Sequence, residues 1–406
     1  MAVVKGFRGI LYNTEKTGDI SRLVAPPYDV INTEEQNALY EKHPFNCVRL
    51  ILSREPGEKR YADSAKTLKN WLDEEILRMD EKPAVYRYLQ EFEFGGKHFT
   101  RKGFIARVKI EDFESGVILP HEKTFKKHKD DRLKLTSACE ANLSQVFSIY
   151  SDLGGDVEKT LSGAAEKPFA EIDFGGIKNT LWRVNSPQAL ERVGDLMADK
   201  KLLIADGHHR YETAINYRNI CRGENKPGDS HEYVMMFLSG AESDGLIVEP
   251  THRGVKNFHG VSAEKLALNL KKEFDCEETH AENCDEIRPD QSVFVYNGGK
   301  KAIVFSPKNS GENYTTMGVV TLQDKVIGKI IEKKMKSEPP EITYIKSRDE
   351  MLNLIKSGEC EAGFIMPRPL IRDIMDASEK GVRMPQKTTY FYPKILSGIV
   401  INPLRD

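Results

Sequence analysis

Cysteine is scarce in this chain: six occur in 406 residues, and no two of them form a Cys-x-x-Cys pair. Structural zinc sites and iron–sulfur clusters need closely spaced cysteines, so the sequence disfavours both. Disulfide-framed secreted proteins are much richer in cysteine. We therefore expect reduced thiols and a cytoplasmic protein.

Long apolar runs are also absent. No stretch approaches the ~18 uninterrupted apolar residues of a membrane-spanning helix. The first residues include Lys5 and Arg8, so charge enters too early for the apolar core of a signal peptide. The sequence therefore predicts neither a signal peptide nor contact with a membrane.

Neither sign of charge is in excess, because the formal net charge is −2. Proteins that bind nucleic acid through bulk electrostatics carry a clear positive excess. The one basic stretch, residues 126–134, is interrupted by Asp130 and Asp131. Nucleic acid is therefore not an expected partner.

Several catalytic motifs are missing. The chain has no Gly-x-x-x-x-Gly-Lys-Ser/Thr loop, no Gly-x-Gly-x-x-Gly after a strand, and no Gly-x-Ser-x-Gly elbow. P-loop, Rossmann, protein-kinase and α/β-hydrolase functions therefore lose support.

The chain is long enough for two or three domains. Strands predicted at 84–94 and 99–110 flank Gly95-Gly96, which indicates a hairpin. Elsewhere strands and helices alternate, and the combination predicts a mixed α/β (α+β) fold. We expect three segments: an N-terminal α/β segment (1–115), a nucleotide- and substrate-binding core (116–260) and a C-terminal α/β domain (261–406).

Two local predictions are specific enough to be tested. Residues 33–42 are predicted to form a helix capped by Thr33, with Glu34 and Glu35 in its first turn. Residues 47–52, which read Cys-Val-Arg-Leu-Ile-Leu, are interpreted as a strand.

The most informative motif is residues 206–210, which reads Asp-Gly-His-His-Arg. It joins the apolar run 202–205 to a predicted helix, so it forms a strand-to-helix turn. The start of a helix favours anions, and glycine lets the backbone approach a ligand closely. The sequence therefore predicts a phosphate or carboxylate site. The simpler alternative is a helix capped by Asp206, with surface histidines.

A second candidate is Glu122, which follows a predicted strand, Pro120 and His121. A carboxylate in this position could act as a general base. The zinc-protease pattern needs a second histidine three residues after the glutamate, and Phe125 stands there. The alternative is an exposed acidic turn.

Other polar groups are candidates for the same pocket, each with a structural alternative. Lys129 and Arg132 lie in the basic stretch, which is either a solvated helix face or a lid over phosphates. Asn142 and Ser144 precede a strand, and Arg253 follows one. Lys387, beside Thr388 and Thr389, could hold phosphate oxygens, although its aromatic neighbours are more often packing residues.

Motifs spread over nearly the whole chain resemble the family catalogued as domain of unknown function 1015. They lie at 25–30, 121–124, 131–133, 141–144, 205–213, 250–253 and 384–394. The last motif reads Pro-Gln-Lys-Thr-Thr at 385–389, where that family usually has Pro-Pro-Lys-Ser-Thr. This sequence keeps the lysine, as Lys387, and the two hydroxyl-bearing positions, as Thr388 and Thr389.

The Asp-Gly-His-His-Arg motif also resembles that of free-serine kinases with a ParB/sulfiredoxin-like fold. The resemblance implies such a core with additional α/β segments, and a kinase that transfers the γ-phosphoryl of ATP to free L-serine to give O-phosphoserine. Mg²⁺ follows from phosphoryl-transfer chemistry and from no motif.

On this interpretation each motif has a role. The catalytic residues are Glu122 as base, Asp206 as its partner or a magnesium ligand, and His209. Nucleotide is bound by Gly207, His208, Arg210, Lys129, Arg132 and Lys387. Substrate is bound by Asn142, Ser144, His121 and Arg253.

Two other functions are alternatives to the kinase. A ParB-like switch would bind and slowly hydrolyse nucleotide while engaging a partner or nucleic acid. A sulfiredoxin-like redox enzyme would need a cysteine at the phosphate turn, and residues 206–210 contain none. The sequence leaves the oligomeric state open, a homodimer included.

Overall fold

The computed structural model describes residues 1–122, 126–284, 287–308, 317–385 and 387–405. The chain divides into two compact units. Unit 1 consists of Met1–Pro120, Thr124–Ile247 and Pro393–Asp406, and unit 2 of His121–Lys123 and Val248–Tyr392. The expected segment boundaries at 115/116 and 260/261 stay a prediction.

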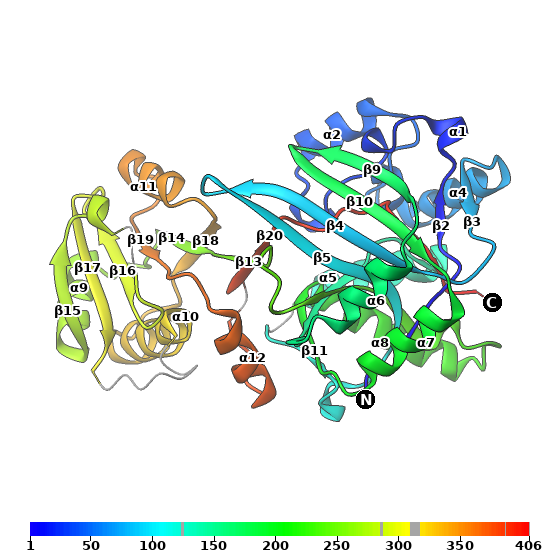
Figure 1. Ribbon diagram of the computed structural model, residues 1–406. Coiled ribbons are helices and arrows are strands. Elements are labelled where there is room, and N and C mark those ends of the chain that lie inside the picture. Colours follow the sequence, from blue (N-terminus) through cyan, green and yellow to red (C-terminus); the bar gives the residue numbers. More distant parts are fainter. Residues whose placement is uncertain (123–125, 285–286, 309–316, 386, 406) are drawn as a thin grey trace. The chain divides into compact units, whose positions relative to one another are not determined.

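Unit 1 is built on a nine-stranded sheet (Figure 1). In spatial order its strands are β6 (Ile118–Leu119), β11 (Leu202–Asp206), β8 (Val146–Tyr150), β12 (Tyr233–Gly240), β5 (Lys97–Lys109), β4 (Val85–Phe94), β10 (Ile177–Val184) and β9 (Pro168–Phe174), with β1 (Val4–Lys5) beside β5. The pairs β6–β11 and β8–β12 are parallel, and the others are antiparallel. The predicted hairpin is β4–β5.

Helices cover this sheet. The helices α6 (Asp156–Ala164), α7 (Pro187–Ala198) and α8 (His208–Gly223) contribute Val157, Val193 and Tyr211 to the core that they share with the strands. The remaining elements of unit 1 are α1 (Thr14–Thr17), α2 (Thr33–Lys42), α3 (Val48–Ile51), α4 (Lys59–Asp73), α5 (Lys126–Cys139), the strands β2 (Ile10–Tyr12), β3 (Leu77–Met79), β7 (Ala141–Asn142) and β21 (Asn402–Pro403), and the 3₁₀ turns η1 (Ile20–Arg22), η2 (Tyr28–Val30), η3 (Phe113–Ser115) and η4 (Ser230–Glu232).

Unit 2 contains a six-stranded antiparallel sheet. Its order is β15 (Phe274–Thr279), β17 (Lys301–Pro307), β16 (Ser292–Tyr296), β19 (Ala362–Ile365), β14 (His252–Asn257) and β18 (Glu341–Ile345). A small separate sheet pairs β13 (Ile247–Pro250) with β20 (Thr389–Tyr392). The helices are α9 (Ala263–Glu273), α10 (Gly318–Val320), α11 (Arg348–Ser357), α12 (Ile371–Glu379), the π-helix η7 (Thr321–Lys334) and the 3₁₀ turn η5 (Ala281–Asn283).

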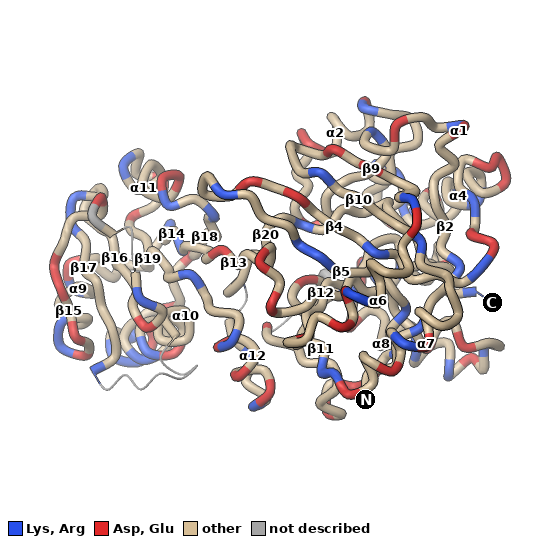
Figure 2. Tube along the Cα trace, in the orientation of Figure 1, with Lys and Arg blue, Asp and Glu red and all other residues tan. Residues whose placement is uncertain are grey.

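The mixed α/β prediction is thus confirmed. Basic and acidic positions are interspersed along both units, as Figure 2 shows, in keeping with the small net charge. Among the helices that the structure describes, none is both long and apolar enough to cross a membrane.

The strand predicted at 47–52 is wrong, because residues 48–51 form the helix α3. The Asn46 side chain accepts a hydrogen bond from the Val48 N–H (2.9 Å), which favours a helical turn. In a run of six residues of which only Arg49 is charged, periodicity does not separate a helix from a strand. Burial of Val48, Leu50 and Ile51 is compatible with either structure, so the pattern alone could not decide.

The start of α2 also differs from the prediction. Its N-cap is Asn32, whose Oδ1 accepts from the Glu35 N–H at 2.9 Å, while the Glu35 carboxylate accepts from the Asn32 N–H at 2.9 Å. This reciprocal arrangement is a capping box, and it places Thr33 one residue inside the helix.

We expect Asn32→Ala to lower the free energy of unfolding by about 1 kcal/mol, because the capping hydrogen bond is lost. The matched control is Thr33→Ala, which leaves the cap in place and is expected to change stability by less than about 0.5 kcal/mol. Urea unfolding followed by circular dichroism measures both. Equal losses in the two variants would contradict the assignment of Asn32 as the cap.

Candidate active site

The turn at 206–208 is shaped by a bulge and a glycine. The β11–β8 register shifts between Ile204 and Asp206, so a bulge at the end of β11 redirects the last side chain of the strand. Gly207 follows with φ +91°, a left-handed conformation that glycine adopts without strain. A Cβ on Gly207 would lie 2.8 Å from Nε of Arg210, so the guanidinium packs directly over this glycine.

The Asp206 carboxylate is held by two cations. Lys394 Nζ lies 2.8 Å from Oδ1, and Arg210 donates from an Nη atom to Oδ2 at 2.6 Å. The Asp206, Lys394 and Arg210 side chains are only 19%, 13% and 11% exposed. Burial alone would raise the pKa of Asp206, but Lys394 and Arg210 outweigh it and hold the pKa well below its usual range. The carboxylate is therefore ionised at neutral pH.

Further positive charge lies near this carboxylate. Arg101 on β5 is fully buried and hydrogen-bonds Gln90 Oε1 at 3.0 Å. Burial lowers the pKa of Arg101 to about 10, while the negative charge of Asp206 is among the interactions that raise it, so the guanidinium stays protonated. His208, which is also buried, acts electrostatically on Asp206. One carboxylate thus stands among three cationic side chains and an imidazole.

A small cavity of about 40 Å³ lies beside α8. It brings together four of the predicted site residues, namely Arg132, Asn142, Ser144 and Arg210. Thr213, one turn after Arg210 on α8, lines the same cavity. Its side-chain oxygen is buried and has no hydrogen-bond partner among the described residues. Such an atom calls for water or a ligand.

Some of these residues also have structural roles. Arg132 donates from Nε to Asp131 at 2.7 Å and lies 4.0 Å from the Tyr28 ring centroid. Asn142 Oδ1 accepts from the Met235 N–H (3.0 Å) and from Asn402 Nδ2 (2.9 Å). The Asn142 oxygen therefore anchors the C-terminal strand β21.

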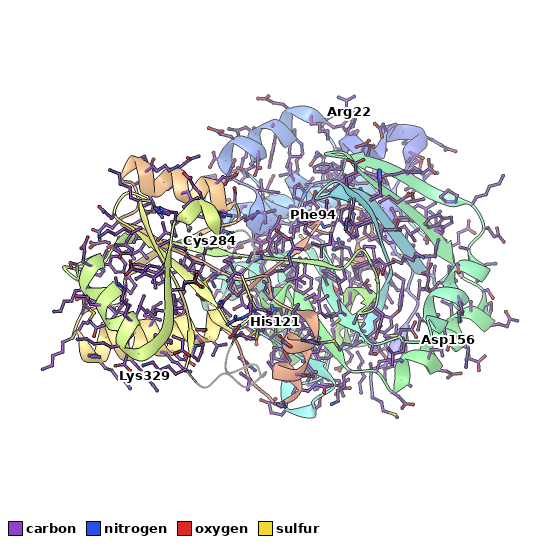
Figure 3. All side chains as sticks on the ribbon, turned by 60° about the vertical axis from the view of Figure 1, so that its left-hand side comes forward. Arg22, Phe94, His121, Asp156, Cys284 and Lys329 are labelled. Atoms are coloured by element: carbon purple, nitrogen blue, oxygen red, sulfur yellow. The ribbon has the colours of Figure 1, made fainter. Side chains whose placement is uncertain are left out.

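In unit 2, Glu122 is held by the segment that begins β20. Its Oε1 accepts from the N–H groups of Thr388 (2.9 Å) and Thr389 (3.2 Å) and lies 3.3 Å from Thr389 Oγ1. His121 Nε2 lies 2.8 Å from the same hydroxyl. His121 is fully buried, and Figure 3 shows it among packed side chains. With its side chain 16% exposed, Glu122 is not part of an exposed acidic turn.

Arg253 belongs to the same cluster. It is 4% exposed, and one Nη donates to the Lys387 carbonyl at 3.0 Å. Burial lowers the pKa of Arg253 to about 10, against the raising effects of Tyr344 and Glu122, so it stays charged at neutral pH. The Lys387 side chain itself is exposed, and its backbone has φ +55°. The cluster fixes the 387–389 segment through backbone groups.

The predicted site residues therefore fall into two groups. Unit 1 holds Asp206, Gly207, His208, His209, Arg210, Arg132, Asn142 and Ser144, and unit 2 holds His121, Glu122, Arg253 and Lys387. The pairing of Glu122 with Asp206 stays a prediction, as does the role of each residue. The Lys129 side chain lies outside the described residues. Gly207, not Asp206, is the N-cap of α8, so Asp206 does not cap the helix.

The residues present do not fit a protein-bound Mg²⁺. Both oxygens of Asp206 are engaged by cations. Within the described parts of the chain, no group of three His, Cys, Asp or Glu side chains could hold a metal ion. Magnesium prefers carboxylate and phosphate oxygens, and two adjacent cations oppose it. The assignment of Asp206 as a magnesium ligand gains no support from this geometry.

Sequence reasoning missed three contributors: Arg101, Thr213 and the role of Lys394. Lys394 ends the 384–394 motif, so the motif already contained the signal. Arg101 lies in the hairpin strand β5 and is fully buried in spite of its charge. Nothing in the spacing of Arg101 or Lys394 relates either residue to Asp206, because they act on Asp206 only in the folded unit.

A family model described as "Protein of unknown function (DUF1015)" matches residues 4–344. No curated protein matches the chain. Solved structures similar to it include a conserved hypothetical protein from Pyrococcus furiosus (15% identity, 69% of this chain and 89% of that chain, TM-score 0.36). A free serine kinase in complex with AMP has 15% identity over 68% and 83% of the two chains, with a TM-score of 0.38. SbnI with a C-terminal truncation, from Staphylococcus aureus, has 12% identity over 74% and 87%, with a TM-score of 0.38.

The buried ion pair makes a pH-dependent contribution that can be measured. The folded-state pKa of Asp206 is lowered, so its stabilisation is present above the ordinary aspartate pKa of about 4 and is lost as the pH falls toward the lowered value. We expect Lys394→Met to reduce the free energy of unfolding by about 2 kcal/mol at pH 7. The difference from the wild type should shrink below about pH 4.

The control is Lys69→Met, which removes an exposed Lys–Asp pair with a 2.6 Å separation and side chains 75% and 61% exposed. It should change stability by less than about 0.5 kcal/mol. Urea unfolding at pH 7 and pH 3 compares the two variants. If Lys394→Met lowered the free energy of unfolding no more than Lys69→Met does, the buried ion pair would not stabilise unit 1 as expected.

Proposed function

The chain belongs to the DUF1015 family, and from the geometry of its unit 1 site we propose that it is a small-molecule kinase. It transfers a phosphoryl group from a nucleotide, ATP in the first instance, to the hydroxyl of a small acceptor. The acceptor proposed is free L-serine, on the resemblance of the 206–210 motif to that of free-serine kinases.

One observation carries the proposal: cations outnumber the single carboxylate at a helix N-terminus. Lys394, Arg210 and Arg101 surround Asp206, and α8 begins directly after the left-handed Gly207. The positive end of the helix dipole points toward the same turn. A polyphosphate would supply the negative charge that this arrangement favours, and phosphoryl transfer depends mainly on alignment and on cations around the phosphates.

Each residue then has a role. Arg210 and Lys394 face the phosphate oxygens, with Gly207 allowing close approach of the backbone. Asp206 is a positioning residue that fixes the two cations through its hydrogen bonds. His208 and His209 are proposed to assist phosphate binding and proton transfer. Glu122 stays the proposed base.

The cavity of about 40 Å³ is the proposed site for a polar group of the acceptor. Arg132, Ser144 and the unpartnered Thr213 hydroxyl line it, so it offers positive charge and hydrogen bonds in a small volume. This lining suits an oxyanion such as a carboxylate. An amino acid with a hydroxyl group has both features that the proposal needs.

The direct test incubates the purified full chain with ATP, Mg²⁺ and L-serine, and detects O-phosphoserine by mass spectrometry. We expect product from the native protein. Glu122→Gln should lose turnover by about 100-fold or more while nucleotide binding is retained, because the base no longer accepts the hydroxyl proton.

A panel of other small hydroxyl compounds and of ADP as donor accompanies this assay. Phosphorylation of another compound instead of serine would support the kinase activity and reject serine as the acceptor. No product with any acceptor would reject the kinase. Nucleotide binding with slow hydrolysis and no transfer would favour the ParB-like switch.

The cavity has its own test. Thr213→Val keeps the shape of the side chain but removes the hydroxyl, so we expect KM for the acceptor to rise about tenfold with nucleotide affinity unchanged. The matched control is Thr160→Val on α6. The Thr160 hydroxyl donates to the Asp156 carbonyl, and both residues are distant in sequence from the 206–210 motif. A change in nucleotide affinity without a change in KM for the acceptor would place the acceptor elsewhere.

A further inference from the structure

A cavity in unit 1 that is larger than the one beside α8 takes no part in the proposed kinase site. Its volume is about 580 Å³, within the range typical of small-molecule sites. It lies where the neighbouring parallel strands β8 and β12 end, at Tyr150 and Gly240. Ligands commonly bind at the carboxyl ends of such strands.

This cavity is separate from the Asp206 turn. Asp206 pairs with Phe147, near the beginning of β8, whereas Tyr150 ends that strand. At ~3.3 Å per residue the two positions are about 10 Å apart along the sheet. None of the residues that line the cavity belongs to the motifs that carry the family resemblance.

Tyr150 is an unpartnered polar group in the cavity wall. Its side chain is buried, with the residue 3% exposed, and its ring packs edge-on against Phe104. Within the described part of the chain its hydroxyl has no hydrogen-bond partner. Burial and then the charges of Asp152, Glu158 and Glu242 raise the pKa of Tyr150, so the hydroxyl is protonated and lies close to these carboxylates. A hydroxyl in a cavity wall that has no protein partner can be satisfied by water or by a ligand.

Four carboxylates line the cavity: Asp152, Glu158, Glu242 and Asp244. The charge of Glu158 is neutralised by Arg87, whose Nη2 lies 2.5 Å from Glu158 Oε1. Asp152 and Glu242 accept hydrogen bonds from the backbone N–H groups of Val157 (3.2 Å) and Asp152 (2.8 Å), which orient them without cancelling their charge. Among the described residues, none of Asp152, Glu242 and Asp244 forms an ion pair.

The lining also limits what could bind. Lys102 and His98 are the basic side chains of the cavity, and both are exposed, as are Glu242 and Asp244. The carboxylates outnumber the basic side chains, so an anion is disfavoured. No described cluster has the ligands to hold a metal ion. The rings of Phe99, Phe104 and Tyr150 add faces and edges that suit an organic cation with an apolar body.

We propose that this cavity is a binding site for a small organic cation, a primary ammonium or guanidinium compound. Its charged group is held by Asp152, Glu242 and Asp244, the Tyr150 hydroxyl completes its hydrogen bonds, and its carbon chain lies against the aromatic rings. The site is independent of the proposed kinase reaction and could be occupied in the absence of nucleotide.

The test is isothermal titration calorimetry of the full chain with agmatine, which has a guanidinium group, an ammonium group and a short carbon chain. Neutral 1,4-butanediol is the uncharged probe. We expect a single site for agmatine in the millimolar range or tighter, weakened by added salt, and no binding of the diol. Glu242→Gln and Asp244→Asn should each weaken agmatine at least fivefold, and Tyr150→Phe should weaken it about threefold.

The matched control is Glu191→Gln, which removes an exposed carboxylate of α7 away from the cavity lining. It should leave agmatine affinity unchanged. Thermal unfolding of each variant shows whether the fold is kept, and Tyr150→Phe retains the ring that packs on Phe104. Absence of agmatine binding to the native protein would overturn the proposal. Equal binding to all variants would also overturn it, because the cation would then be bound elsewhere.

Discussion

The candidate site of unit 1 depends on one interaction, the pairing of the ionised Asp206 carboxylate with Lys394 and Arg210. A carboxylate only 19% exposed is tolerated because Lys394 and Arg210 each take one of its oxygens. Arg210 then packs over Gly207, which explains why the turn needs a residue without a Cβ. The same arrangement keeps positive charge in excess around the start of α8.

The location of the turn could be predicted from sequence because its signals are local. An apolar run, a glycine and a helical pattern lie next to one another along the chain, and the structure has β11, Gly207 and α8 at those positions. The partners of Asp206 could be predicted only in part. Arg210 is four residues away on the helix, whereas Arg101 and Lys394 reach the site through sheet pairing and through the return of the C-terminal segment.

The errors have physical causes. Four of the six residues at 47–52 are buried, including neighbours along the chain, so periodicity in this short run could not separate the helix α3 from a strand. Asn32 and Thr33 are both good N-cap residues, and the reciprocal contact with Glu35 decides between them. In unit 2, the local sequence around Glu122 gave no sign that the N–H groups of Thr388 and Thr389 are its partners, because they are more than 260 positions away.

Unit 1 is discontinuous in the chain, and this has a consequence for its biosynthesis. Residues 393–406 return to unit 1 after the whole of 248–392, and they supply Lys394 to Asp206 and Asn402 to Asn142. During translation the Asp206 carboxylate therefore emerges long before the lysine that neutralises it. Unit 1 cannot reach its final charge balance until Lys394 has left the ribosome, and residues 248–392 of unit 2 are synthesised in the interval.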